Sequence, residues 1–168
     1  MKIKVSGIWW LGAVVVALTV GACMPAIAQS PYRLGVGLGV PYGGIGMNVE
    51  MQGSSQLAPT AGIGSMVLGG TGLGWNVGTR YYLKPSAGEK HRGSRITLLF
   101  GTNAFAKSDR SFLSLTSEYK TMTGITLGFG TQGKSWNFDL LFELPTSSVP
   151  AGYTKSTGSI DLSFGRMF

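Results

Sequence analysis

The chain is poor in charged residues and in side chains that bind metals. Charged residues make up 12% of its 168 residues, against about 25% in an average soluble protein. The only histidine is His91, and the only cysteine is Cys23. Because a histidine-rich metal site needs several histidines, such a site is excluded. We expect no metal and no cofactor.

Long apolar runs are missing beyond the first 30 residues. No later stretch approaches the ~18 consecutive apolar residues that indicate a transmembrane helix, yet the mean hydropathy of the chain is positive. Glycine is abundant, with 27 residues, and glycine weakens helices. A β-barrel with a lipid-facing outer surface reconciles the low charge, the positive hydropathy and the lack of an apolar helix.

The N-terminus has the three-part form of a secretory signal. Lys2 and Lys4 precede an apolar core, and small residues follow up to Ala28. We therefore predict a cleaved signal peptide, residues 1–28, and a mature barrel domain, residues 29–168. The sequence from Val20 to Cys23 also resembles the cleavage site of bacterial lipoproteins, in which the cysteine is lipidated. Cleavage after Ala28 would leave no thiol for a disulfide or a metal, and either cleavage predicts export.

Strict alternation of apolar and polar residues predicts strands, because successive side chains on a strand point to opposite faces. The clearest segment runs from Trp136 to Leu144, and seven others cover residues 32–40, 45–52, 57–68, 75–84, 95–100, 122–130 and 160–168. The segment Pro41 to Gly44 has turn-forming composition, and Ser108–Ser117 and Thr146–Thr157 are expected to be long loops. Eight strands are enough to close a small barrel. We predict an all-β fold: a closed, antiparallel, up-and-down transmembrane barrel of about eight strands.

The last predicted strand carries Ile160, Leu162 and Phe164 at every second position, and the chain ends on Phe168. This pattern resembles the C-terminal signature of bacterial outer-membrane barrels, which the barrel assembly machinery reads. Arg166 interrupts the apolar series. In layout, residues 31–168 resemble the small OmpA-like and OmpX-like outer-membrane barrel proteins. The resemblance implies the fold, the outer membrane of a Gram-negative bacterium and a structural or surface-interacting role, and it carries over no functional residues.

The polar face of the predicted strands carries charges of both signs. The lumen of an eight-stranded barrel has room only for its own side chains, so we expect these residues to form a packed polar network with no open pore. A catalytic acid and base pair is the other interpretation of the carboxylates, but every small barrel needs polar filling that neutralises itself. The predicted network comprises Arg33, Glu50, Arg80, Arg95, Asp139, Glu143 and Asp161.

Two motifs invite an enzymatic interpretation. Residues Gly128 to Ser135 fit the phosphate-loop formula, but phosphate binding there needs a following helix, and a strand pattern follows instead. We therefore predict a hairpin turn. His91 and Ser94 resemble the histidine and serine of barrel hydrolases that trim lipopolysaccharide, but their connection faces the periplasm in an up-and-down barrel. We expect no enzyme activity and no catalytic residue.

The sequence thus predicts a structural or surface-interacting, porin-like barrel without an open pore, located in the outer membrane and monomeric. Its expected partners are outer-membrane lipids, lipopolysaccharide and the assembly machinery. Lys107, Arg110 and Lys120 flank a long outward loop where lipopolysaccharide phosphates would be met. The basic residues are otherwise scattered, so we expect no nucleic-acid binding. Two alternatives stay open: a lipid A-modifying barrel enzyme and a periplasmic β-sandwich lipoprotein.

Overall fold

The computed structural model describes residues 31–53, 55–66, 72–83, 91–108, 119–149, 151–155 and 159–168. The predicted signal peptide and Cys23 lie outside the described residues. Apart from one 3-10 turn, η3, the elements are all strands. They are β1 (Tyr32–Gly39), η3 (Val40–Tyr42), β2 (Gly44–Met51), β3 (Leu57–Ser65), β4 (Leu73–Tyr82), β5 (Gly93–Ser108), β6 (Tyr119–Gln132), β7 (Trp136–Pro145), β8 (Tyr153–Lys155) and β9 (Ser159–Met167).

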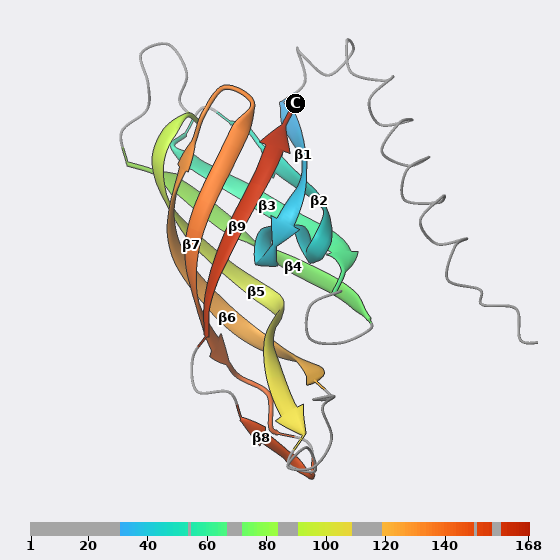
Figure 1. Ribbon diagram of the computed structural model, residues 1–168. Helices are drawn as coiled ribbons and strands as arrows, with labels where there is room; N and C mark the ends of the chain where they lie inside the picture. Colours follow the sequence, from blue (N-terminus) through green and yellow to red (C-terminus); the bar gives the residue numbers. More distant parts are fainter. Residues whose placement is uncertain are drawn as a thin grey trace, which may run out of the picture. The chain divides into compact units, whose positions relative to one another are not determined.

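Eight of these strands form one closed barrel (Figure 1). Each strand from β1 to β6 pairs antiparallel with the strand that follows it, β7 pairs with β9, and β9 pairs with β1 to close the barrel. The predicted all-β fold, the closure and the eight barrel strands are confirmed. A β-sandwich consists of two stacked sheets, so the sandwich alternative is wrong for the described part of the chain. No described helix has the length and apolar character needed to cross a membrane.

The barrel has two ends, which we name by what connects there. The terminal end holds the start of β1 and the finish of β9, together with the β2–β3, β4–β5 and β6–β7 connections. The loop end holds the β1–β2, β3–β4, β5–β6 and β7–β9 connections. Because the strands alternate in direction, both termini of the barrel lie at the terminal end.

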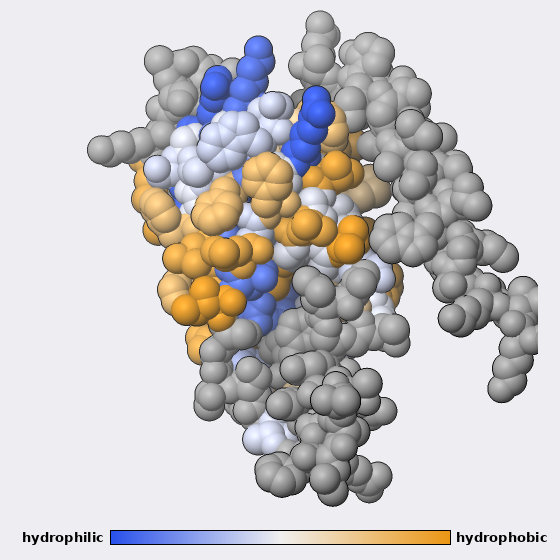
Figure 2. Space-filling model, in the orientation of Figure 1, coloured by the Kyte–Doolittle hydropathy of each residue, from blue (hydrophilic) through white to orange (hydrophobic). Residues whose placement is uncertain are grey.

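The predicted alternation is confirmed, with apolar side chains outside. On β7, Phe138, Leu140 and Phe142 are 36–48% exposed, whereas Asp139 and Leu141 between them are fully buried. Ile160, Leu162 and Phe164 of the predicted C-terminal signature are also exposed. Figure 2 shows hydrophobic residues over much of one face of the barrel. The interior is mostly polar, and Val40, Leu99 and Leu141 form its small apolar cluster.

The loop end differs from the prediction. Strands β5 and β6 have 16 and 14 residues, longer than the predicted segments, and they continue past the barrel (Figure 1). The connection from Thr146 to Thr157 was expected to be loop throughout, but it contains β8, which pairs with Ala106–Ser108 of β5. Buried Ala106 and Met122 pack there with Val149 and Tyr153. A small sheet with its own apolar contacts therefore extends the barrel.

The first connection also differs. The alternation over residues 32–40 puts Val40 on the apolar, outward face of the first predicted strand, but Val40 is 5% exposed and belongs to the 3-10 turn. Pro41 and Tyr42 are buried with it. The predicted tight turn is present, with Gly43 in the left-handed region at φ 65°, but the turn folds into the lumen instead of lying in solvent.

Candidate functional site: the packed lumen

Four charged side chains meet inside the barrel. Arg80 Nη1 lies 2.8 Å from Glu50 Oε2, and Arg95 Nη2 lies 2.8 Å from Asp139 Oδ2. Arg95 Nη1 lies 3.9 Å from the same Glu50 oxygen, which links the two pairs. All four side chains are 0% exposed. The two positive and two negative charges balance, so the network is neutral as a unit.

Neutral groups add hydrogen bonds to the carboxylates of this network and to Arg95, whereas Arg80 Nε and Nη2 are buried without a hydrogen-bond partner. Tyr82 Oη donates to Glu50 Oε1 at 2.9 Å, and Ser163 Oγ donates to Asp139 Oδ2 at 3.2 Å. Arg95 holds Asp139 with two nitrogens and also donates to Gln132 Oε1 at 2.6 Å. A buried ion pair is tolerated only when further hydrogen bonds satisfy its charged atoms. The carboxylates here have such partners on several strands.

The 3-10 turn closes the lumen toward the loop end. Asn48 Nδ2 donates to Pro41 O at 3.0 Å, and Asn76 Nδ2 donates to Val40 O. The Val40 amide donates to Asp161 Oδ2 at 3.1 Å. These bonds satisfy backbone groups that would otherwise be buried without partners, so the turn is held as a plug by side chains from β2, β4 and β9.

Glycines on two strands make room for the ring of Tyr42. A Cβ atom at Gly35 would lie 3.3 Å from the Tyr42 ring, and one at Gly37 would lie 2.7 Å from it. A Cβ at Gly165 would overlap the Tyr42 hydroxyl. That hydroxyl donates to Asn137 Oδ1 at 2.6 Å. Glycine is therefore required where the plug meets β1 and β9.

The terminal end is crossed by Arg33. Its guanidinium donates to the backbone oxygen of His91 at 3.4 Å and to that of Lys134. His91 is 6% exposed, and its ring packs nearly perpendicular to the ring of Tyr82, with the ring centres 5.3 Å apart. Arg33 thus joins β1 to the β4–β5 and β6–β7 connections at the terminal end of the lumen.

The structure brings four predicted network residues together and separates three. Glu50, Arg80, Arg95 and Asp139 form the ion pairs. Arg33 contacts backbone oxygens, Asp161 holds the plug, and Glu143 is buried on β7. Sequence reasoning missed Tyr42, Tyr82, Asn48, Asn137 and Gln132. The bare glycine positions on β1 and β9 were the one sequence signal that something large fills the lumen.

The described side chains fill the lumen around the charged network. A water-filled channel would leave its lining side chains accessible to water, but Arg80, Arg95, Glu50 and Asp139 are 0% exposed. Side chains from opposite walls meet across the interior instead. Within the described residues, no three His, Cys, Asp or Glu side chains group as a metal site would require.

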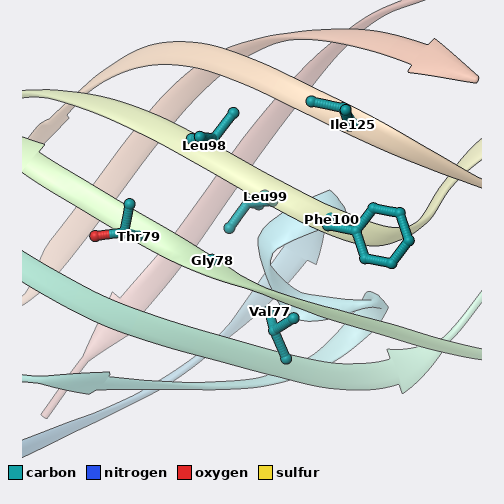
Figure 3. A pocket seen from close by; sticks show the side chains of 7 residues that line it. All are labelled: Val77, Gly78, Thr79, Leu98, Leu99, Phe100 and Ile125. Atoms are coloured by element: carbon teal, nitrogen blue, oxygen red, sulfur yellow. The ribbon is translucent and has the colours of Figure 1, made fainter. Parts of the chain in front are cut away.

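An apolar hollow lies on the outer surface over β4, β5 and β6. It has a volume of about 270 Å³ and carries no charged group (Figure 3). Its lining residues are Val77, Gly78, Thr79, Leu98, Leu99, Phe100 and Ile125. Such a surface suits contact with hydrocarbon, since it offers no acid, base or nucleophile beyond one threonine hydroxyl.

The basic residues predicted to flank the long outward loop are only partly described. Lys120 is exposed on β6, whereas the side chains of Lys107 and Arg110 lie outside the described part.

Residues 132–136 form the predicted hairpin turn. The Gly133 amide donates to Trp136 O at 2.8 Å, and a strand follows. The phosphate-loop interpretation therefore lacks the helix that it needs.

No known protein family, curated protein or solved structure matches the chain. The closed eight-stranded barrel is compatible with the small outer-membrane barrel proteins, and this compatibility is one of architecture alone.

Proposed function

We propose that this chain is a structural or surface-interacting β-barrel of the bacterial outer membrane, with a packed polar lumen and no open pore. The observation that carries the proposal is the inverted distribution of polarity. The barrel encloses a charged network and exposes large apolar side chains on each of its eight strands. Water-soluble proteins seldom expose apolar patches larger than a few hundred Å². Lipid is the solvent that fits such an outer surface.

The dimensions agree with a membrane span. Strand β7 has 10 residues, and at ~3.3 Å per residue and a tilt of ~40° it covers about 25 Å. The apolar band of outer-membrane barrels is also about 25 Å tall. The length of the exposed apolar strand therefore suits the hydrocarbon layer.

Exposed aromatic residues lie near both ends of the strands. Tyr32, Tyr81 and Trp136 are near the terminal end, and Trp75 is near the loop end. Trp75 also packs edge to face against Phe100. Aromatic side chains are enriched at the two membrane–water interfaces, where one edge is apolar and the other is hydrated. Their positions support a membrane that covers the strands between them.

The lipid A-modifying enzyme is less well supported. His91 is buried against Tyr82 at the terminal end, which faces the periplasm when the chain enters from that side. The lipid A substrate lies in the opposite leaflet. The packed lumen likewise favours a structural role, because its carboxylates are committed to arginines.

Membrane fractionation with heat-modifiable gel migration tests the proposal. We expect the chain in the outer-membrane fraction, with the unboiled protein migrating differently from the boiled protein, because a closed barrel resists detergent unfolding. Equal mobility before and after boiling, or recovery in the soluble periplasmic fraction, would contradict the proposal. In planar bilayers we expect no stable channel conductance, and a stable single-channel current would contradict the closed lumen.

A further inference from the structure

Arg166 is out of place in the apolar outer face of β9. Ile160, Leu162 and Phe164 precede it at every second position and are exposed outside the barrel. Arg166 shares that face and is exposed as well. It sits beside the terminal end, directly across from Trp136 on β7. Its position on the strand is therefore the expected depth of a membrane interface and not of the hydrocarbon.

The neighbouring β6–β7 turn brings a second cation to the same place. The Met167 amide donates to Ser135 O at 2.9 Å, which fixes the turn against the end of β9. Arg33 donates to the backbone oxygen of Lys134 from inside the barrel, while Lys134 itself is exposed. The turn is thus anchored from two sides, and Lys134 lies close in the chain to Trp136.

Trp136 adds an aromatic surface to these cations. A Cβ atom at Gly133 would lie 2.5 Å from Trp136 Cε2 and 2.9 Å from its Cδ1. The indole therefore lies over the turn, where only glycine leaves room for it. Its ring is 45% exposed, which places an interfacial aromatic beside Arg166 and Lys134.

The terminal end carries positive charge among the described side chains. Arg33, Arg92, Lys134 and Arg166 are located there. The four described Asp and Glu side chains lie elsewhere: Glu50 and Asp139 are paired inside the lumen, while Glu143 and Asp161 stand on the parts of their strands nearer the loop end. The α-carboxylate of Phe168 is the one negative group described at the terminal end. An anionic partner is the electrostatic complement of this end.

We propose that Arg166, Lys134 and Trp136 form a binding site for the phosphate group of an anionic phospholipid in the leaflet at the terminal end. The inference rests on the proposed membrane location. A guanidinium binds phosphate oxygens through two parallel hydrogen bonds, an ammonium adds attraction, and the indole lies at headgroup depth. Each basic residue near an anionic membrane surface strengthens binding about fivefold.

Quenching of Trp136 by brominated lipids tests this site. The full-length chain is made with Trp9, Trp10 and Trp75 replaced by Phe, so that Trp136 is the only tryptophan. It is folded into phosphatidylcholine vesicles that contain, at equal amounts, either brominated phosphatidylglycerol or brominated phosphatidylcholine. We expect stronger quenching by the phosphatidylglycerol, corresponding to at least about a fivefold preference.

Three variants identify the residues responsible. Arg166→Gln combined with Lys134→Gln should bring the preference close to one, and Arg166→Lys should retain most of it because the charge remains. Lys120→Gln removes an exposed lysine from β6 toward the other end and should change nothing. A chain with Trp75 as its only tryptophan should show no preference, since Trp75 lies near the loop end. Heat-modifiable migration of each variant verifies that the barrel has formed.

The possible failures are distinguishable. If neither brominated lipid quenches Trp136, the residue is not in a membrane and the proposed function fails along with the site. If both lipids quench Trp136 equally while the barrel is folded, the membrane location stands and the phosphate site is refuted. A preference that persists in the Arg166→Gln and Lys134→Gln double variant would also refute it.

Discussion

Replacing Arg95 with methionine should destabilise the folded barrel by about 3–5 kcal/mol, the range measured when one partner of a buried ion pair is removed. Arg95 is fully buried, and it donates to Asp139 from Nε at 3.0 Å and from Nη2 at 2.8 Å. Without it, the side-chain hydrogen bonds that Asp139 keeps among the described residues are those from the hydroxyl groups of Ser163 and Thr97, at 3.2 and 3.4 Å. Two hydroxyl hydrogen bonds do not compensate for the desolvation of a carboxylate.

The double variant Arg95→Met with Asp139→Leu should recover most of this loss. Both charges are then gone, and replacing a buried pair by apolar side chains of similar volume is often neutral or stabilising. The sum of the stability losses in the two single variants should therefore exceed the loss in the double variant by up to ~3 kcal/mol, a coupling typical of residues in direct contact. Glu50 keeps Arg80 and Tyr82 as partners in all three variants.

Urea unfolding of the barrel in phospholipid vesicles, followed by tryptophan fluorescence, measures these free energies. Lys120→Met is the control, because it replaces an exposed cation on β6 by the same apolar residue and should alter stability by no more than ~0.5 kcal/mol. A loss below ~1 kcal/mol for Arg95→Met, or a double variant that loses the full sum of the singles, would refute the argument that the lumen depends on paired charges.

Three further outcomes are expected. Leu140 lies on the outer face in the middle of β7, and Leu140→Arg should lower the free energy of unfolding in vesicles by ~2–4 kcal/mol. Ser135→Arg, in the exposed turn, should lower it little. Equal small losses for the two variants would place the outer face in water. Gly165→Ala should lower the free energy of unfolding by ~1–3 kcal/mol, because the added methyl group would crowd Tyr42, and the loss should be clearly smaller in a Tyr42→Ala background. The same loss in both backgrounds would exclude that contact as the cause. His91→Ala should leave the acylation of host lipid A, measured by mass spectrometry, the same as with the unaltered chain; a modification that depends on His91 would support the enzyme alternative.

The barrel strands were predictable from the sequence because every strand faces two contrasting environments. On β7 the alternation from Trp136 to Leu144 is nearly complete, and the structure has that strand with the same outward face. The prediction stopped short on β5, at Phe100, for a physical reason. The pairing of β5 with β6 shifts register between Thr102 and Ala104, and such a bulge changes which residues share a face. Beyond the bulge, the residues of β5 no longer follow one period-two pattern, so the pattern does not predict the rest of the strand.

The pairing of charges was not predictable in the same way. Alternation places a residue on the inner face but does not say which wall its side chain reaches. Arg33 and Glu50 are direct cross-strand partners in the β1–β2 register, yet the Arg33 guanidinium contacts the backbone oxygens of His91 and Lys134. Glu50 pairs instead with Arg80 and Arg95. These choices depend on barrel curvature, which brings β2, β4 and β5 around one space.

The plug shows a related limit. Pro41 and Gly43 are enough to predict a turn, because their backbone preferences are local. The direction of the turn depends on empty volume at Gly35, Gly37 and Gly165, which lie on two strands far apart in the sequence. Only the closed barrel brings those vacancies opposite Tyr42. A local pattern therefore predicts that the chain reverses, and the long-range packing decides that it reverses inward.

Under the proposed function, the two ends of the barrel are the surfaces left for selective contacts, because the lumen is filled and lipid covers the strands between. A barrel that only spanned the membrane could end all its strands at the interface. Here β5 and β6 continue beyond the barrel at the loop end, where β8 pairs with β5. Ala106 and Met122 are buried there, with Val149 and Tyr153 packed against them. This apolar cluster outside the barrel holds the extension in a defined shape. Recognition of a partner at the cell surface requires such a defined shape. Removing those contacts, for example by Met122→Ala, should therefore weaken the binding of a surface partner to the extension, while the barrel itself stays folded and heat-modifiable.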